Sequence, residues 1–309
     1  MVQNDQNLKI SIVIPTYNHA HFLSKCLKSV INQTFTNWEA IVVNNFSEDN
    51  TINIVESFDD HRIHLVNFKN NGIIAASRNK GIKLSRADLI AFLDSDDMWY
   101  PTKLSRCIEE LTHDRDLVCH NLRYIRNGKY WKDVKCGPAK RASFNNLLNN
   151  GSCLTTSAVV VRKECLLRVD GFSIDPKIVT SEDYDLWLKL SREMVRFHFI
   201  DEILGEYLVN ETSASKAVLR HMNAGLTVVE KHFGAKDKIN IWDQLCLRRT
   251  KALLFSNAAR SYHLNGRKME AFKFYWKSLS TFPFILKTYA RFVLTFIGKC
   301  DCKSITKQG

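Results

Sequence analysis

The sequence predicts an α/β fold, with a mostly parallel sheet covered by helices on both faces and an all-helical extension at its C-terminal end. Two observations predict it. Over the first 120 residues short apolar runs alternate with helical patterns, which is typical of repeated β-α-β units. From about Lys216 onward only helical patterns remain. The 309 residues, 45% of them hydrophobic, are enough to bury a sizeable core.

Four strands and three helices are expected to alternate in the first 120 residues. The strands are Ile10–Ile14, Glu39–Val43, Ile63–Phe68 and Leu89–Leu93, and the helices are Phe22–Asn32, Thr51–Ser57 and Ala75–Leu84. Right-handed crossovers bring the carboxyl ends of parallel strands to one edge of the sheet, where ligands bind in open α/β folds. We therefore expect one cleft lined by the loops Pro15–Asn18, Asn44–Ser47 and Asp94–Asp97.

The run Leu89–Leu93 ends abruptly in the acidic loop Asp94-Ser95-Asp96-Asp97. Carboxylates crowded at the end of a buried strand repel one another unless a cation lies among them. Oxygen ligands of this kind suit Mg²⁺ or Mn²⁺, which can hold phosphates in turn. The alternative is an acidic turn that caps a helix starting near Pro101.

Residues 121–180 are less regular, and only Ala158–Val161 resembles a strand there. Ser181 is a natural N-cap for the helix that follows, whose apolar stripe includes Trp187. Three acidic residues crowd its first turn, namely Glu182, Asp183 and Asp185. Favourable interaction with the helix dipole explains some of these acidic residues without any chemistry.

The net charge of +12 is concentrated in the C-terminal third of the chain. Residues 1–215 hold 26 basic and 27 acidic side chains, whereas residues 216–309 hold 18 basic and 5 acidic ones. Such an excess points to an acidic partner, either nucleic acid or anionic lipid. No nucleic-acid recognition motif or stacking platform is visible, so we expect no nucleic-acid partner.

The extension is predicted to contain a helical hairpin, Ala258–Tyr275, that turns at Gly266. The helix after Pro283 is basic on one side and apolar on the other, where Phe292 and Phe296 lie. Two interpretations stay open: an interfacial membrane anchor, or a stripe that packs on the domain.

The nine cysteines are odd in number and scattered, which favours reduced thiols and a cytoplasmic location, peripheral on the inner membrane face if the last helix is an anchor. No secretory signal and no spanning helix are expected. The histidines show no ligand spacing and are interpreted as surface or core residues.

Several motifs, in the right order over residues 9–215, together resemble the family 2 glycosyltransferases of GT-A fold. They are Ser11–Asn18, Ser29–Thr34, Ala76–Gly81, Phe92–Asp97, Gly171-Phe172 and Glu182–Trp187. The resemblance implies a catalytic domain over 1–215, with a nucleotide-sugar half (1–120) and an acceptor half (121–215), followed by a basic helical extension over 216–309. The family transfers a sugar from a nucleoside diphosphate to an acceptor hydroxyl, usually with inversion. A glycan or lipid-linked acceptor in surface polysaccharide synthesis is expected.

The resemblance also assigns roles to residues of this chain. Asp183 would be the base that deprotonates the acceptor hydroxyl, and Asp94 and Asp96 would hold the metal. The expected nucleotide-sugar contacts are Pro15, Thr16, Tyr17, Asn44, Asn45, Arg78, Asp94 and Ser95. The residues expected to contact the acceptor or to support these groups are Asp97, Glu182, Trp187 and Asn210. An ordinary surface charge on a helix is the alternative for Arg78.

The chain departs from the family pattern at two places. Relatives commonly carry Asp-Asp-Gly-Ser where Asn44-Asn45-Phe46-Ser47 stands, and many carry His in place of Asn210. An amide both donates and accepts hydrogen bonds, so uracil and thymine suit the site, cytosine is admitted, and guanine is disfavoured. The identity of the nucleobase stays open, with a UDP-sugar favoured. Because Asn210 stands where many relatives carry His, we expect an altered affinity for the metal.

Two other functions stay open from the sequence. A nucleotidyltransferase shares the nucleotide-binding sheet and an acidic metal site, but Pro15–His19 lacks the glycine and lysine of its phosphate loop. A catalytically inactive binding protein would explain the asparagine replacements, although Asp94, Asp96 and Asp183 are intact.

Overall fold

The computed structural model describes residues 10–209, 214–235 and 239–297. The chain divides into two compact units, which are described separately. Unit 1 comprises Met1–Leu147, Gly151–Pro176 and Glu182–Asn210, and unit 2 comprises Leu148–Asn150, Lys177–Ser181 and Glu211–Gly309.

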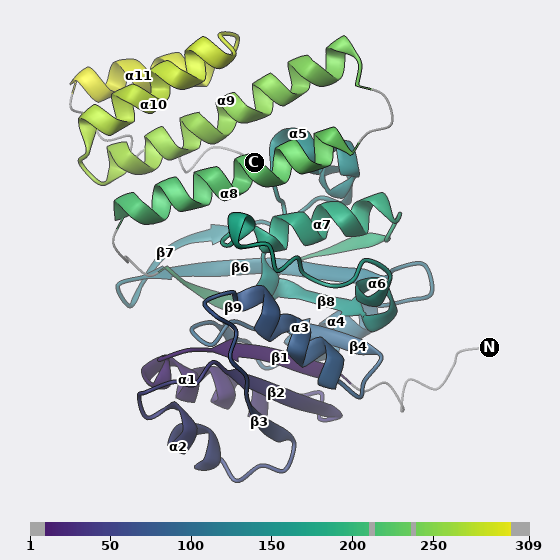
Figure 1. Ribbon diagram of the computed structural model, residues 1–309. Coiled ribbons are helices and arrows are strands. Elements are labelled where there is room, and N and C mark those ends of the chain that lie inside the picture. The colour runs from purple at the N-terminus through teal and green to yellow at the C-terminus, as the bar shows by residue number, and fades with distance from the viewer. Residues whose placement is uncertain (1–9, 210–213, 236–238, 298–309) are drawn as a thin grey trace. The chain divides into compact units, whose positions relative to one another are not determined.

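The described residues of unit 1 form one nine-stranded sheet (Figure 1). Its strands in spatial order are β3 (Ile63–Asn67), β2 (Trp38–Asn44), β1 (Ile10–Thr16), β4 (Leu89–Phe92), β8 (Val159–Arg162), β6 (Leu117–Arg126), β9 (Phe197–Val209) and β5 (Met98–Trp99), while β7 (Lys129–Val134) pairs with β6. The first four run parallel to one another, and β8 is antiparallel to β4. The four strands predicted in the first 120 residues are confirmed, and the predicted α/β class with them.

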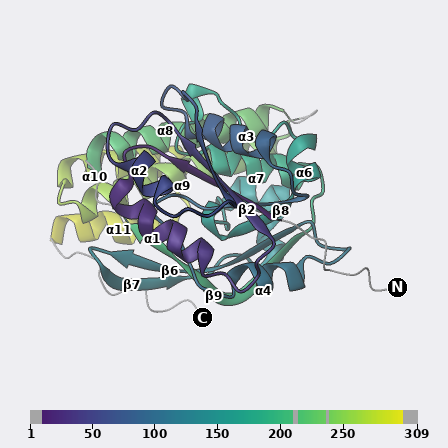
Figure 2. The same ribbon diagram turned by 90° about the horizontal axis from the view of Figure 1, so that it is seen from below.

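Helices cover both faces of this sheet. They are α1 (Ala20–Ile31), α2 (Thr51–Glu56), α3 (Ile74–Leu84), α4 (Lys103–Glu110), α6 (Lys163–Arg168) and α7 (Glu182–Arg192). Figure 2 shows α1 and α3 on opposite sides of the strands. On the α1 side, Leu23 and Leu27 join Ile12 in one buried cluster. On the other side α3 lies so close to β1 that a Cβ on Gly81 would approach the Val13 side chain to 2.4 Å.

The second half of β6 and the whole of β7 correct the expectation that residues 121–180 are irregular apart from Ala158–Val161. The edge strand β7 is polar and largely exposed, so its sequence shows no apolar run. Strand β9 pairs in parallel with β6, and the register shifts around Asn121. Such pairing between segments far apart in the chain leaves no short-range signal.

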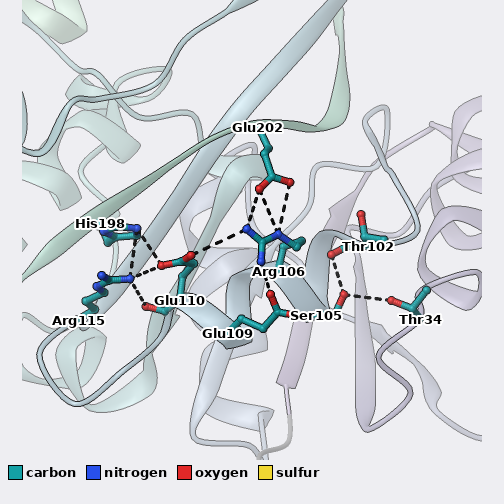
Figure 3. A network of polar contacts seen from close by, with 9 residues as sticks. All are labelled: Thr34, Thr102, Ser105, Arg106, Glu109, Glu110, Arg115, His198 and Glu202. Carbon is teal, nitrogen blue, oxygen red and sulfur yellow. Dashed lines mark hydrogen bonds and ion pairs between the residues drawn. The ribbon is translucent and has the colours of Figure 1, made fainter.

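A polar network ties α4 to the strands beside it (Figure 3). Arg106 is bonded to Glu202 at 2.7 Å and to Glu109. The Glu110 carboxylate forms an ion pair with Arg115, and its Oε2 lies 3.2 Å from His198 Nε2. Most of these side chains contact solvent, so each pair contributes little to stability and the network serves to orient the helix.

Lys103, at the start of α4, is an exception to the solvated charges around it. Its side chain is fully buried, and its Nζ has no hydrogen-bond partner in the part of the chain that the structure describes, although it lies 3.6 Å from the centre of the Trp99 ring. Burial lowers the pKa of Lys103 to about 8. A buried ammonium without a carboxylate destabilises the folded state.

Replacing Lys103 with Met is therefore expected to raise the free energy of unfolding at pH 7 by about 2 kcal/mol. The folded protein releases this proton near pH 8, whereas the unfolded chain keeps it to about 10.5. Between about pH 8 and 10.5 the unfolded state binds more protons than the folded state, so the free energy of unfolding of the wild type rises with pH. The difference in stability between the variant and the wild type therefore shrinks over this range. Urea unfolding at pH 7 and pH 10 measures both effects; a less stable variant at pH 7 would contradict the account.

Unit 2 contains the helices α8 (Ala214–Gly234), α9 (Ile241–Leu264), α10 (Lys268–Thr281) and α11 (Leu286–Ile297). Asn240 and Asp243 form a reciprocal capping box that starts α9. Gly266, at φ +74°, makes the turn between α9 and α10, which confirms the predicted hairpin. Short α5 (Phe144–Asn150) is shared by the two units.

Helix α11 presents apolar side chains on two sides. Phe292 packs against the core of the hairpin, with its ring 4.9 Å from that of Phe272. Leu286, Tyr289 and Val293 are exposed instead, Leu286 by 81%. Within the described ranges no helix has the length and hydrophobicity needed to cross a membrane.

Candidate active site

A cleft of about 350 Å³ lies in unit 1 at the carboxyl ends of β1 and β4. Its size is within the range of small-molecule sites. It is lined by Pro15, Thr16, Tyr17, His19, Asn45, Asn70, Gly72, Ile74, Asp94, Ser95, Asp96 and Tyr207. Thr16 and Asn44 are paired across β1 and β2, so the loops after these strands start side by side. The predicted cleft at this edge of the sheet is present.

The two asparagines after β2 have different positions. Asn44 is fully buried; it donates to Asn67 at 2.8 Å and accepts from Ser47 Oγ at 2.6 Å. It therefore holds the strand ends together. Asn45 lines the cleft, and its Oδ1 accepts from the backbone N–H of Asn70 at 2.9 Å. The half-exposed Tyr17 ring lines the same cleft.

The acidic loop divides its carboxylates between the cleft and the interior. Asp94 and Asp96 line the cleft. Asp97 is buried, accepts from Ser157 Oγ at 2.5 Å and from the backbone N–H of Leu208 at 3.0 Å, and so anchors β9. Burial, and then the charges of Asp96 and Asp94, raise the pKa of Asp97 well above its usual range. Asp97 is therefore a support of the loop rather than a group of the cleft.

The two cleft carboxylates fit a divalent cation. Burial, followed by the negative charge of Asp94, raises the pKa of Asp96, although His19 and Arg78 oppose the shift. Among the described residues, no three His, Cys, Asp or Glu side chains are arranged to hold a metal alone. Mg²⁺ commonly binds through one or two carboxylates and substrate phosphates, and the pair Asp94 and Asp96 matches that pattern.

Arg78 joins the acidic loop to helix α7. Its side chain is 4% exposed, with Nη2 2.7 Å from Asp94 Oδ1 and Nη1 2.9 Å from Glu182 Oε1. Burial alone would lower the pKa of Arg78, but Asp94 and Glu182 together raise it above its ordinary value. The guanidinium is thus a buried cation between two carboxylates and does not line the cleft, whereas an ordinary surface charge would be solvated.

The segment Thr156–Ala158 connects the acidic loop with Asp183. Ser157 Oγ accepts from the backbone N–H of Asp94 at 3.1 Å, and Thr156 Oγ1 lies 3.5 Å from Asp183 Oδ2. Asp183 is half-buried in the first turn of α7, where its Oδ1 accepts from the N–H of Tyr184 at 2.7 Å. One short segment therefore contacts both the acidic loop and the carboxylate expected to act as base.

Trp187 and Asn210 were also expected near the site. Trp187 is fully buried in the core, so its ring contacts no solvent and does not line the cleft. Asn210 lies outside the described residues.

The residues that line the cleft and were not foreseen from the sequence are His19, Asn70, Gly72, Ile74 and Tyr207. His19 lines the cleft with its Nδ1 2.8 Å from Ser95 Oγ; its place directly after Pro15–Asn18 was the available signal. Tyr207 reaches the cleft from the distant strand β9. Phe46, in the loop after β2, adopts φ +54° and is 57% exposed.

Comparisons with known proteins agree with this architecture. The family model for glycosyl transferase family 2 matches residues 11–172. The UDP-Glc:alpha-D-GlcNAc-diphosphoundecaprenol beta-1,3-glucosyltransferase WfgD of Escherichia coli is 35% identical, over 60% of this chain and 70% of that protein. Chondroitin synthase of Pasteurella multocida is 29% identical, over 63% of this chain and 20% of that protein.

The crystal structure of S. aureus TarS 1-349 in complex with UDP superimposes with a TM-score of 0.63 at 19% identity, over 96% of this chain and 89% of that one. This likeness concerns the fold, and it confirms the predicted GT-A architecture with its C-terminal helices. The family match covers more than half of the chain, and the relative from Escherichia coli matches over more than two thirds of its own length. The chain belongs to glycosyl transferase family 2.

Proposed function

We propose that this glycosyltransferase moves a sugar from a nucleoside diphosphate donor, a UDP-sugar in the first place, to a hydroxyl of a glycan or lipid-linked acceptor in surface polysaccharide synthesis. One observation carries the proposal: the segment Thr156–Ala158 contacts both the acidic loop at the cleft and the half-buried Asp183. A donor site and a base are thus held by one structural element. We assign residues 1–215 to catalysis and 216–309 to the extension.

The donor would lie in the cleft, with its nucleobase near Tyr17 and Asn45 and its diphosphate near Asp94 and Asp96. Pro15, Thr16 and Ser95 form the walls between these groups. The UDP preference is supported by the UDP-glucose named for the relative from Escherichia coli and by the UDP bound to TarS. Arg78 would act through Asp94, which it orients.

Asp94 and Asp96 would hold Mg²⁺ or Mn²⁺ together with the diphosphate oxygens. Such an ion supplies positive charge at the leaving diphosphate. Asp183 would take the proton of the acceptor hydroxyl while the acceptor oxygen bonds to the anomeric carbon and the diphosphate departs with its electron pair. Attack from the face opposite the diphosphate inverts that carbon and requires no covalent glycosyl-enzyme intermediate.

A panel of nucleotide sugars tests the proposal. Among UDP, GDP, CMP and dTDP, the cognate nucleotide should raise the melting temperature in the presence of Mn²⁺, because selective binding stabilises the folded state. The matching nucleotide sugar should release its nucleotide faster when an acceptor is added. A melting shift without any turnover would indicate an inactive binding protein. Formation of a nucleoside triphosphate and a sugar 1-phosphate when pyrophosphate is added to the nucleotide sugar would indicate a nucleotidyltransferase.

Metal dependence gives a separate prediction. Asp96→Asn is expected to lower kcat/KM at least about 100-fold and to weaken Mn²⁺ binding in the presence of UDP, because one of two ligand carboxylates is lost. Turnover during a Mn²⁺ titration after chelation measures the change. Asp88→Asn is the matched control, because Asp88 is an exposed residue at the amino end of β4. This variant should behave as the wild type. Turnover that survives chelation in the wild type would contradict the metal assignment.

We also propose that the extension lies on an anionic membrane surface, on the cytoplasmic side. Leu286 and Val293 are exposed apolar residues of a helix that also carries Lys287 and Arg291, as interfacial helices do. The full chain should co-sediment with phosphatidylglycerol vesicles and release at high salt. The variant Leu286→Ser/Val293→Ser should sediment less. Equal sedimentation with neutral and anionic vesicles, or of variant and wild type, would overturn this part.

A further inference from the structure

Three aromatic side chains form a row across the strands β9, β6 and β7. The rings of Tyr207 and Tyr124 are stacked with their centres 4.6 Å apart and an angle of 24° between them. The ring of Trp131 follows, 6.4 Å from that of Tyr124. These strands lie next to one another in the sheet (Figure 1), and Tyr124 is paired directly with Tyr207. We call Tyr207, Tyr124 and Trp131 the aromatic row.

The aromatic row begins at the reaction site and ends at the surface. Tyr207 lines the cleft that holds Asp94 and Asp96. Strand β6, which carries Tyr124, contacts the segment Thr156–Ala158, whose Thr156 Oγ1 lies 3.5 Å from Asp183 Oδ2. Trp131, on the edge strand, is 38% exposed. A molecule lying along the row would therefore reach from solvent to the space between the donor and the proposed base.

Cations accompany the aromatic row. Lys132 Nζ lies 4.5 Å from the centre of the Trp131 ring and 5.4 Å from that of Tyr124. The guanidinium of Arg126 lies 5.5 Å from the Trp131 ring. The hairpin of residues 121–136 contains five basic side chains and one acidic side chain, Asp133, and that one is bonded to Arg123. The charged side chains that lie over the rings of the row, Lys132 and Arg126, are thus both basic.

We propose that the aromatic row is the acceptor platform of the enzyme, and that it binds a saccharide that carries a negative charge next to its ring. The inference rests on the proposed function, which requires an acceptor hydroxyl near Asp183. The C–H groups on one face of a pyranose give that face an apolar character that suits an aromatic ring, while its hydroxyls stay in water. Lys132 and Arg126 then meet a phosphate or carboxylate beside the sugar.

The opposite face of the same hairpin offers a matched control. Tyr130 is 61% exposed, but its ring lies 5.4 Å from Arg123, which neighbours Tyr124 in sequence and so points to the other side of β6. Tyr130→Ala removes an exposed aromatic ring from the hairpin without touching the row.

Acceptor binding by calorimetry, which needs no turnover, tests the platform on the full chain in the presence of UDP. The probes are an N-acetylhexosamine 1-diphosphate with a short alkyl tail, an oligosaccharide with a uronic acid, and a neutral alkyl glycoside. Trp131→Ala should raise the Kd of the best anionic probe about tenfold, and Trp131→Phe should stay within about threefold of the wild type. Tyr130→Ala should change nothing. Equal losses in Trp131→Ala and Tyr130→Ala, or no binding of any probe to the wild type, would overturn the platform.

Lys132→Met tests whether the acceptor carries a negative charge. It should weaken binding of the anionic probe and leave binding of the neutral glycoside unchanged. The probe that loses affinity, diphosphate or uronic acid, identifies the source of the charge; equal effects on charged and neutral probes would contradict it. The melting shift caused by UDP is measured on the same variants and should not change. An unchanged acceptor affinity in Trp131→Ala with a normal UDP shift refutes the platform alone, whereas a wild type without any nucleotide shift refutes the proposed function.

Discussion

Asp183→Asn is expected to lower the rate of sugar transfer by a factor of about 10²–10⁴, which is the usual contribution of a positioned general base. The amide keeps the shape of the side chain, and its oxygen can still accept from the N–H of Tyr184, but it cannot take a proton from the acceptor. Binding of the nucleotide should be unchanged, because Asp183 is not among the residues that line the cleft. Steady-state release of UDP, with and without acceptor, measures the effect.

The control for this variant is Glu193→Gln, since Glu193 is exposed just beyond the end of the same helix. It should transfer at the wild-type rate. Equal turnover in Asp183→Asn and the wild type would remove Asp183 as the base and leave the acceptor to be activated by another group.

Arg78→Met is expected to lower the free energy of unfolding by about 3 kcal/mol, the largest effect on stability that we predict. The substitution leaves the buried carboxylate of Glu182 without its 2.9 Å partner and releases Asp94, which is 26% exposed and can turn toward water. Transfer should fall as well, because Asp94 loses the contact that orients it. Urea unfolding at pH 7 measures the stability.

A double variant separates the buried pair from a general packing defect. Arg78→Met/Glu182→Gln should recover part of the lost stability, because the second change removes a buried negative charge that has lost its ion pair with Arg78. Losses that simply add, or an Arg78→Met protein as stable as the wild type, would contradict the buried ion pair.

Local patterns predicted the nucleotide half of the sheet well. The runs that became β1, β2 and β4 are buried on both faces, so they are largely apolar and easy to recognise. The carboxyl-end loops then follow from the handedness of the crossovers. Solvent-exposed parts of the sheet, such as β7, were not predictable, because their alternating or polar residues resemble those of a loop.

The site was predictable where one motif supplies it and not where distant segments meet. Asp94 and Asp96 follow directly from the end of one strand. The position of Asn44 inside the fold depends on Asn67, and the contact of Asp183 depends on Thr156, so neither follows from a single stretch of sequence. Tyr207 belongs to β9, whose pairing with β6 is set by tertiary packing.

A crystal structure with UDP and Mn²⁺ tests the central claim most directly. We predict the ion between Asp94, Asp96 and the diphosphate, the uracil beside Tyr17 and Asn45, and the carboxylate of Asp183 facing the open side of the cleft. An ion bound elsewhere, or an Asp183 carboxylate directed away from the nucleotide, would contradict the assignment of the donor site and the base.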